Sequence, residues 1–347
     1  MTDHEPFQRG PQNPQDPQVV VFSPELLKLA DRRRQALEDC RQAAEDGDAN
    51  AVVQMGMNCL YGIGGAAKDP KKAFRWFSQT APDDPAGLYW LGVCYDNGFG
   101  VERDEDRACR LYQESAAGDY APALCNLGVC YESGQGVEKN LEKAVELYRR
   151  AAEGGYPMGR CNLGVMYFFG QGVEKDLKKA AYCFAQAAEQ RLPRAQYLLG
   201  VCYETGDGVE KKPRYAAYMY HRAALQGHPE AMLRLGICYE TGVGTEKDPA
   251  IAANLYRQAA EQGSDLARCR LGRLYEQGLG VERDLRRAEE LYEAGTRAGV
   301  SGAKEALDRV RAALAAPPEP QPEDKPVDKK SPLRRLLDRL KGPKSEE

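Results

Sequence analysis

The chain has 347 residues, with 48 basic and 52 acidic side chains, a formal net charge of -4 and 42% hydrophobic residues. This near balance lacks the basic footprint of a nucleic-acid binder, so we expect no nucleic-acid partner. No apolar run is long enough to span a membrane, and the first residues lack the basic and apolar segments of a secretory signal. We therefore expect a cytoplasmic protein.

The N-terminal part divides into an arm and a helix. Residues 1–22 are rich in proline and glutamine, with little to bury, and should form a disordered arm. A capping helix is predicted over 23–48, because Ser23 can serve as its N-cap and Pro24 suits the first helical position.

Seven units follow over residues 49–300, each reading as helix, glycine loop, helix. A Leu-Gly or Met-Gly pair in the first helix, helix A, recurs every 36 residues, with its glycines at Gly56, Gly92, Gly128, Gly164, Gly200, Gly236 and Gly272. Helix A ends at a G-x-G loop such as Gly170/Gly172. The second helix, helix B, starts behind a cap such as Asp176 and carries an aromatic residue flanked by alanines, such as Phe184. Since the paired glycine lacks a Cβ, a neighbouring helix is expected to approach closely there.

The C-terminal part is predicted to hold a capping helix at 301–315, a disordered linker at 316–330, a short amphipathic helix at 331–342 and a tail at 343–347. The short helix has an apolar stripe and a basic flank: Leu333, Leu336, Leu337 and Leu340, with Arg334 and Arg335 beside them. A helix of this length is more typical of docking on a protein. Weak surface binding to anionic lipid and docking in the protein's own groove remain open alternatives.

Eleven cysteines could indicate a disulfide scaffold, but their positions in the repeat favour another interpretation. One repeat position holds Cys94, Cys130, Cys202 and Cys238, and the same position holds Met166 and Leu274 in other units. A position that accepts cysteine, methionine or leucine requires an apolar filler, which free cysteine supplies. We expect reduced thiols in the core or the groove wall.

The tandem unit A…LG..Y..G.GV..D..KA..Y..AA..G, over roughly residues 30–315, resembles the Sel-one-like repeat family, a relative of the tetratricopeptide repeat. The resemblance implies that A helices line a concave groove used for protein binding, as in adaptors that assemble complexes. Together with the fixed period, it predicts an all-α, right-handed α-solenoid of seven 36-residue helix-loop-helix repeats with terminal cap helices.

The same resemblance implies which positions of helix A face the groove: two residues before the leucine, one after the glycine, and four and five after the glycine. The partner-binding candidates at these positions are Tyr89, Tyr197, Asp96, Glu132, Glu204, Glu240, Glu276, Phe168 and Phe169. The acids could form a ridge that steers a basic segment, or simply a solvated face. Phe168 and Phe169 stand where most other units have an acid and a small polar residue, which fits an interaction anchor or packing on a neighbouring loop.

No arrangement of residues indicates catalysis. Only three histidines are present, and no C-x-x-C or H-E-x-x-H spacing occurs. We predict a non-catalytic adaptor or scaffold without cofactor or metal, which binds a protein or peptide in the concave groove. The alternative is a membrane-surface or envelope-associated scaffold recruited through the basic amphipathic helix at 331–342.

Overall fold

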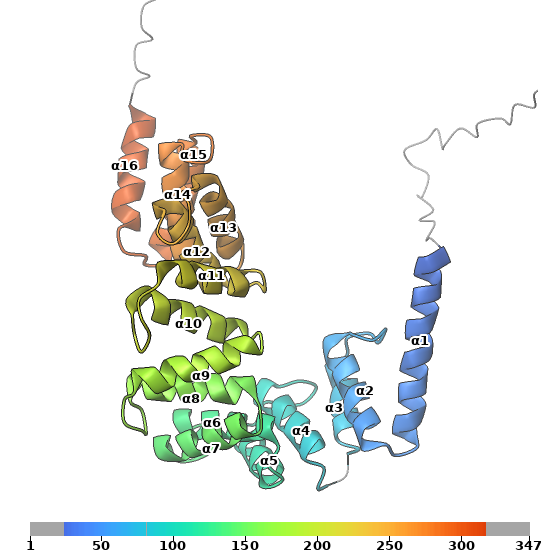
Figure 1. Cartoon of the computed structure of the whole chain (residues 1–347). Coiled ribbons are helices and arrows are strands. Elements are labelled where there is room, and N and C mark those ends of the chain that lie inside the picture. Colours follow the sequence, from blue (N-terminus) through green and yellow to red (C-terminus); the bar gives the residue numbers. More distant parts are fainter. Residues whose placement is uncertain (1–23, 81, 317–347) are drawn as a thin grey trace, which may run out of the picture. The chain divides into compact units, whose positions relative to one another are not determined.

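The structure is a computed structural model that describes residues 24–80 and 82–316 (Figure 1). The predicted arm at 1–22, nearly all of the linker, the segment 331–342 with its leucines and arginines, and the tail lie outside the described residues. Within the described residues every regular element is a helix, which confirms the all-α prediction. None of these helices combines the length and the apolar character that crossing a bilayer requires.

Sixteen helices are described. Their bounds are α1 (Pro24–Glu45), α2 (Ala49–Tyr61), α3 (Pro70–Phe77), α4 (Pro85–Asn97), α5 (Glu105–Ala117), α6 (Ala121–Ser133), α7 (Leu141–Glu153), α8 (Pro157–Phe169), α9 (Leu177–Glu189), α10 (Pro193–Thr205), α11 (Pro213–Ala224), α12 (Pro229–Thr241), α13 (Pro249–Glu261), α14 (Asp265–Gln277), α15 (Leu285–Arg297) and α16 (Ala303–Ala315). The even-numbered helices α2 to α14 are the A helices of the seven repeats, and the odd-numbered helices α3 to α15 are the B helices.

The chain forms two compact units, and each is described by itself. Unit 1 comprises residues 1–235 with 243–245, and unit 2 comprises residues 236–242 with 246–347. The boundary falls within α12. In unit 1, helix A of each repeat packs most extensively on its own helix B, and helix B packs on the next helix A (Figure 1). In unit 2, α14 packs in the same way on α15, which is followed by α16.

The repeat at 157–192 shows why these residues form two helices. The Asp176 carboxylate accepts a hydrogen bond from the Lys179 N–H at 2.9 Å and so caps α9. Gly170 ends α8 in the left-handed conformation, with φ of 68°, and donates its N–H to the Met166 carbonyl. A residue with a Cβ would be strained there, whereas glycine adopts this conformation readily.

The paired glycine of helix A faces the aromatic residue of helix B in the same repeat. A Cβ built on Gly164 would lie 2.7 Å from the Phe184 ring, which is closer than carbon atoms normally approach. The other repeats show the same packing, with Tyr148 against Gly128 and Tyr256 against Gly236. The predicted close approach is confirmed, and its partner is a ring rather than a helix backbone.

The second glycine of each later G-x-G loop packs against the first residue of the preceding helix B. A Cβ on Gly172 would lie 2.4 Å from the Leu141 carbonyl oxygen, and one on Gly208 would lie still closer to that of Leu177. The corresponding contacts in other repeats join Gly100 to Pro70, Gly136 to Glu105, Gly244 to Pro213 and Gly280 to Pro249. Each loop therefore connects its repeat to the one before it.

Small and aromatic side chains fill the space between the helices. Ala180, Ala187 and Phe184 of α9 form one buried cluster with Cys161 and Leu199 of the flanking A helices. None of the eleven cysteines, all within the described residues, is paired in a disulfide, and nine are buried, where thiols pack as small apolar groups. At the N-terminal end, Ala44 of α1 packs with Met55 of α2.

Candidate protein-binding surface

The candidate acids lie near the C-terminal end of helix A, and each accepts a hydrogen bond from a tyrosine of helix B in the same repeat. The hydroxyl-to-carboxylate distances are 2.6 Å for Tyr148 and Glu132, 2.7 Å for Tyr256 and Glu240, 2.9 Å for Tyr292 and Glu276, and 3.4 Å for Tyr112 and Asp96. Tyr220 donates to Glu204 in the same way. The five acids therefore have a structural partner inside their own repeat.

Burial decides the protonation of these tyrosines. Burial is the main cause that raises the pKa of Tyr148, Tyr220 and Tyr256 well above its usual value, and the hydrogen bond to the carboxylate raises it further. The hydroxyls therefore remain protonated and act as donors. A neutral donor held against a carboxylate makes a charge-assisted hydrogen bond, which fixes the end of helix A on helix B.

Two repeats lack this hydrogen bond, and in both the two positions change together. The first repeat has Leu60 and Phe77, and the fourth has Phe168 and Phe184. An apolar residue in helix A thus accompanies a phenylalanine in helix B. Sequence reasoning missed this pairing, although the paired replacement was visible in the aligned repeats.

Phe168 and Phe169 occupy different environments. Phe168 is half-buried and packs against the cluster that contains Phe184 and Leu199. Phe169 is 63% exposed, and its ring lies edge-on to Phe168 with ring centres 5.1 Å apart. The structure thus holds Phe168 in the protein and presents Phe169 to solvent.

Tyr89 and Tyr197 are half-buried within groups of rings. The Tyr89 ring lies 5.5 Å from that of Tyr120 and 5.9 Å from that of Tyr112. The Tyr197 ring stacks on the His228 imidazole at 5.1 Å. Burial raises the pKa of Tyr89, so its hydroxyl is neutral. Tyr89 and Tyr197 are each only partly buried, so part of both rings remains accessible to solvent.

In unit 2, three arginines that sequence reasoning overlooked bind two of the candidate acids. Glu240 is only 9% exposed and contacts Arg270, at 3.4 Å, and Arg273. Glu276 forms a two-bond pair with Arg309 at 2.7 and 3.0 Å. The hydrogen bond with Arg309 is the main cause that lowers the pKa of Glu276. Arg273 follows the paired Gly272, a position that sequence analysis had placed in the groove, and Arg309 is its equivalent in α16, where Asp308 replaces the glycine.

The described residues contain no cluster of histidine, cysteine and acidic side chains arranged to hold a metal ion.

The repeat itself decides the family. The Sel1 repeat model matches residues 49–81, 85–120, 121–156, 157–192, 193–228, 229–264 and 265–300, well over half of the chain. The chain belongs to the Sel1 repeat family. Those ranges follow the helix A and helix B pairs described above, so the predicted resemblance is confirmed.

Two solved Sel1-type structures are similar to this chain. A protective antigen with an SLR fold from uropathogenic Escherichia coli strains is 34% identical with a TM-score of 0.65, over 79% of this chain and 59% of that one. A Sel1 repeat protein from Oxalobacter formigenes is 30% identical with a TM-score of 0.60, over 81% of both chains. These Sel1 structures show the solenoid fold.

Two curated relatives share only part of their length with this chain. DAP3-binding cell death enhancer 1 from Rattus norvegicus is 33% identical over 96 residues, 26% of this chain and 18% of that protein. A putative sel1-like repeat-containing protein of Acanthamoeba polyphaga mimivirus is 34% identical over 76 residues, 22% of this chain and 14% of that protein. The chain therefore spans less than a fifth of the length of either curated relative.

Proposed function

We propose that this Sel1 repeat protein is a non-catalytic scaffold that binds a protein or peptide on the surface of its A helices, centred on α8. The observation that carries the proposal is the exposure of Phe169 beside the anchored Phe168. A large ring that is already held in place loses little freedom on binding, so most of its buried area contributes to affinity.

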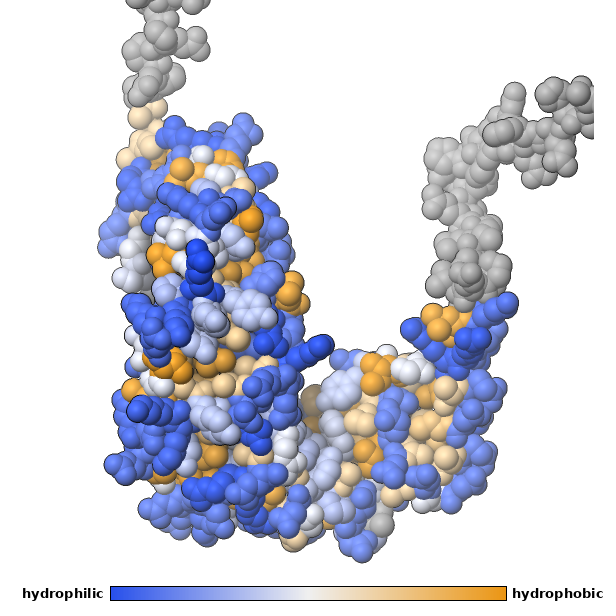
Figure 2. Space-filling model, viewed as in Figure 1, coloured by the Kyte–Doolittle hydropathy of each residue, from blue (hydrophilic) through white to orange (hydrophobic). Residues whose placement is uncertain are grey.

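The surface next to Phe169 supports the proposal. The position after the paired glycine carries Val129, Val165 and Val201 in α6, α8 and α10, and these side chains are half-buried or exposed. Valine has few side-chain rotamers, so it presents a stiff apolar contact. On the visible face of the molecule, apolar residues lie among hydrophilic ones (Figure 2).

The test compares Phe169→Ser with a matched control. Tyr182 lies on α9, helix B of the same repeat, and is 67% exposed, so Tyr182→Ser removes a similarly exposed ring from the other helix. Immobilised wild type and variants are incubated with lysate of the source organism, and the retained proteins are quantified by mass spectrometry. Circular dichroism confirms that helix content is unchanged.

We expect Phe169→Ser to reduce retention of specific partners by about thirtyfold, the effect of losing roughly 2 kcal/mol at an interface hot spot. Tyr182→Ser should leave retention within about twofold, as for a residue outside the hot spot. Equal retention by wild type and Phe169→Ser, or a loss caused by Tyr182→Ser alone, contradicts a binding surface on the A helices.

A further inference from the structure

The groove position after the paired glycine changes its chemistry along the chain. It is apolar in six repeats and becomes arginine in the seventh and at the equivalent position of the cap helix, after Asp308: Met57, Val93, Val129, Val165, Val201, Ile237, Arg273 and Arg309. This change from aliphatic to cationic gives the C-terminal end of the array a surface chemistry that the earlier repeats lack at this position. The position before the leucine carries arginine in the sixth and seventh repeats, at Arg234 and Arg270.

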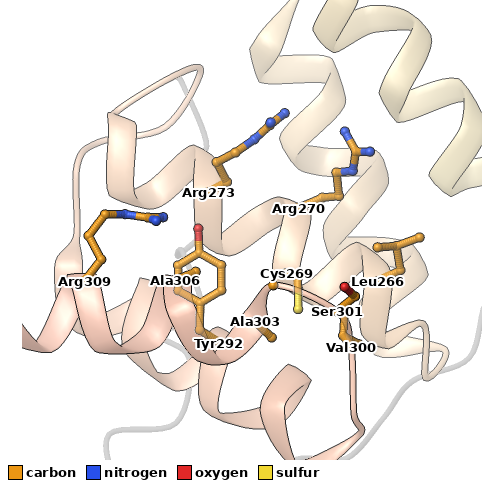
Figure 3. Close-up of a pocket in the computed structure, with 11 residues that line it drawn as sticks. Leu266, Cys269, Arg270, Arg273, Tyr292, Val300, Ser301, Ala303, Ala306 and Arg309 are labelled. Carbon is orange, nitrogen blue, oxygen red and sulfur yellow. The ribbon is translucent and has the colours of Figure 1, made fainter.

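Arg270, Arg273 and Arg309 line one pocket of unit 2, with a volume of about 300 Å³ (Figure 3). In Figure 3 the three side chains lie on one side of the pocket, with Cys269, Val300 and Ser301 on the other. The pocket is thus two-sided, with a cationic wall from α14 and α16 and a largely apolar wall. Leu266, which is partly exposed, extends the apolar wall.

The wall carries more positive than negative charge. Three guanidinium groups face two carboxylates, Glu240 and Glu276, and each carboxylate also accepts a tyrosine hydroxyl. The acids are therefore fully engaged. The Arg273 Nε is buried and has no hydrogen-bond partner, whereas the Arg273 side chain as a whole is 42% exposed, so its outer nitrogens are the ones a ligand can reach.

This geometry selects a carboxylate next to apolar atoms. A guanidinium binds a carboxylate through two parallel hydrogen bonds, and this match is stronger than a neutral pair. The apolar wall suits the methylene groups of a glutamate side chain, whereas a free inorganic anion would gain nothing from it. The excess of one positive charge fits a single carboxylate rather than a polyanion.

We infer that the pocket lined by Arg270, Arg273 and Arg309 binds a glutamate side chain of an acidic peptide segment in a partner protein. The inference rests on the proposed protein-binding function and assigns a chemical class to one part of the ligand. The Phe169 surface belongs to unit 1, so each surface is tested by its own experiment.

The test measures fluorescence anisotropy of a labelled peptide, Gly-Leu-Glu-Glu-Leu-Gly, on the full chain. The same peptide with glutamine in place of glutamate is the neutral control for the ligand. We expect the glutamate peptide to bind at least about tenfold more tightly, and this difference to shrink as salt is raised. This comparison uses the unaltered protein, so it does not depend on how any variant folds.

Variants then locate the site. Arg273→Gln and Arg309→Gln should each weaken the glutamate peptide by about fivefold or more. Arg286→Gln removes the same charge from an exposed position on α15 and should change affinity by less than about twofold. Arg273→Lys keeps the positive charge but loses the planar guanidinium that can donate two parallel hydrogen bonds. Its affinity for the glutamate peptide should lie between those of wild type and Arg273→Gln.

Equal binding of the glutamate and glutamine peptides overturns the inference. A loss of peptide affinity in Arg286→Gln as large as that in Arg273→Gln also overturns it. Displacement of the peptide by millimolar inorganic phosphate does the same, because either result shows that binding depends on charge alone. If one of these results is found while Phe169→Ser still loses partner retention, the proposed scaffold function is supported and only the carboxylate-binding role of the pocket is refuted.

Discussion

Phe184→Tyr should destabilise the repeat at 157–192 unless Phe168 is changed to glutamate in the same protein. Phe184 is 1% exposed, and Phe168 occupies the position from which Glu132 accepts the tyrosine hydroxyl in the preceding repeat. A buried hydroxyl without a partner costs about 1–3 kcal/mol. In the double variant the hydroxyl can bond to the new carboxylate, as Tyr148 does to Glu132 at 2.6 Å.

The size of the effect follows from these contacts. Phe168→Glu alone loses apolar packing against the cluster around Phe184, a cost of about 1–2 kcal/mol. The double variant keeps that loss but gains a charge-assisted hydrogen bond and avoids the unpaired hydroxyl. We therefore expect the two changes to be coupled by about 2 kcal/mol in the stabilising direction.

The assay is urea unfolding of the four proteins of the cycle, followed by far-ultraviolet circular dichroism. Because a repeat array need not unfold in one step, hydrogen exchange of the amides in α8 and α9 assigns the change to this repeat. The reverse swap, Glu132→Phe with Tyr148→Phe, is a matched cycle and should show coupling of the same sign. Additive free energies, within about 0.5 kcal/mol, would refute the reasoning.

Three further predictions concern packing and titration. Gly164→Ala should lower the free energy of unfolding by about 1–3 kcal/mol, because its Cβ would lie 2.7 Å from the Phe184 ring. Gly272→Ala, whose Cβ would have its nearest contact at 3.3 Å, should lower it much less, and calorimetry of the two variants measures the difference. Burial lowers the pKa of the His228 imidazole, so the contribution of the neutral imidazole to stability is complete above about pH 6.5 and is lost as pH falls through the lowered pKa. The midpoint of urea unfolding should fall over the same pH range, and His228→Gln should remove this pH dependence. Burial raises the pKa of the Cys161 thiol to about 11, so maleimide should label it about a hundredfold more slowly in the folded protein than in urea.

Each of these has an outcome that contradicts it. Equal melting temperatures for the two glycine variants would show that the ring can move aside at no cost. A pH dependence that persists in His228→Gln would assign it to another group. Labelling of Cys161 as fast as that of the partly exposed Cys40 would show that α8 opens readily.

Backbone requirements made the repeat predictable from sequence. A residue such as Gly170 must reach positive φ at a helix end, and a residue such as Asp176 must cap the next helix, and few residue types do either. These demands are local, so they appear as fixed letters at a fixed spacing. The order of helices and loops followed from them.

The candidate site was less predictable because its contacts join positions far apart in the chain. Glu132 was recognised as a groove-facing acid, but its hydrogen bond to Tyr148 depends on how two helices pack. The pair formed by Glu276 and Arg309 depends on the packing of successive A helices. Such contacts leave a trace only as paired changes between repeats, as at Phe168 and Phe184. Whether the acids also contact a partner stays a prediction.

The contact between each G-x-G loop and the preceding helix B also bears on how such a chain can change its length. A duplication or deletion of one whole 36-residue period, cut at any point, recreates every loop contact, whereas one extra residue between Gly170 and Asp176 shifts Gly172 off Leu141. The first repeat is the instructive exception, because its loop holds one residue more. There a Cβ on Gly64, the second glycine of the loop, would meet the Asn58 side chain of its own helix α2, at 3.2 Å, rather than a preceding helix. In this chain the loop that is longer by one residue is thus the one that does not pack against a preceding helix B. In the other repeats the array can change its length in one genetic step only by entire periods.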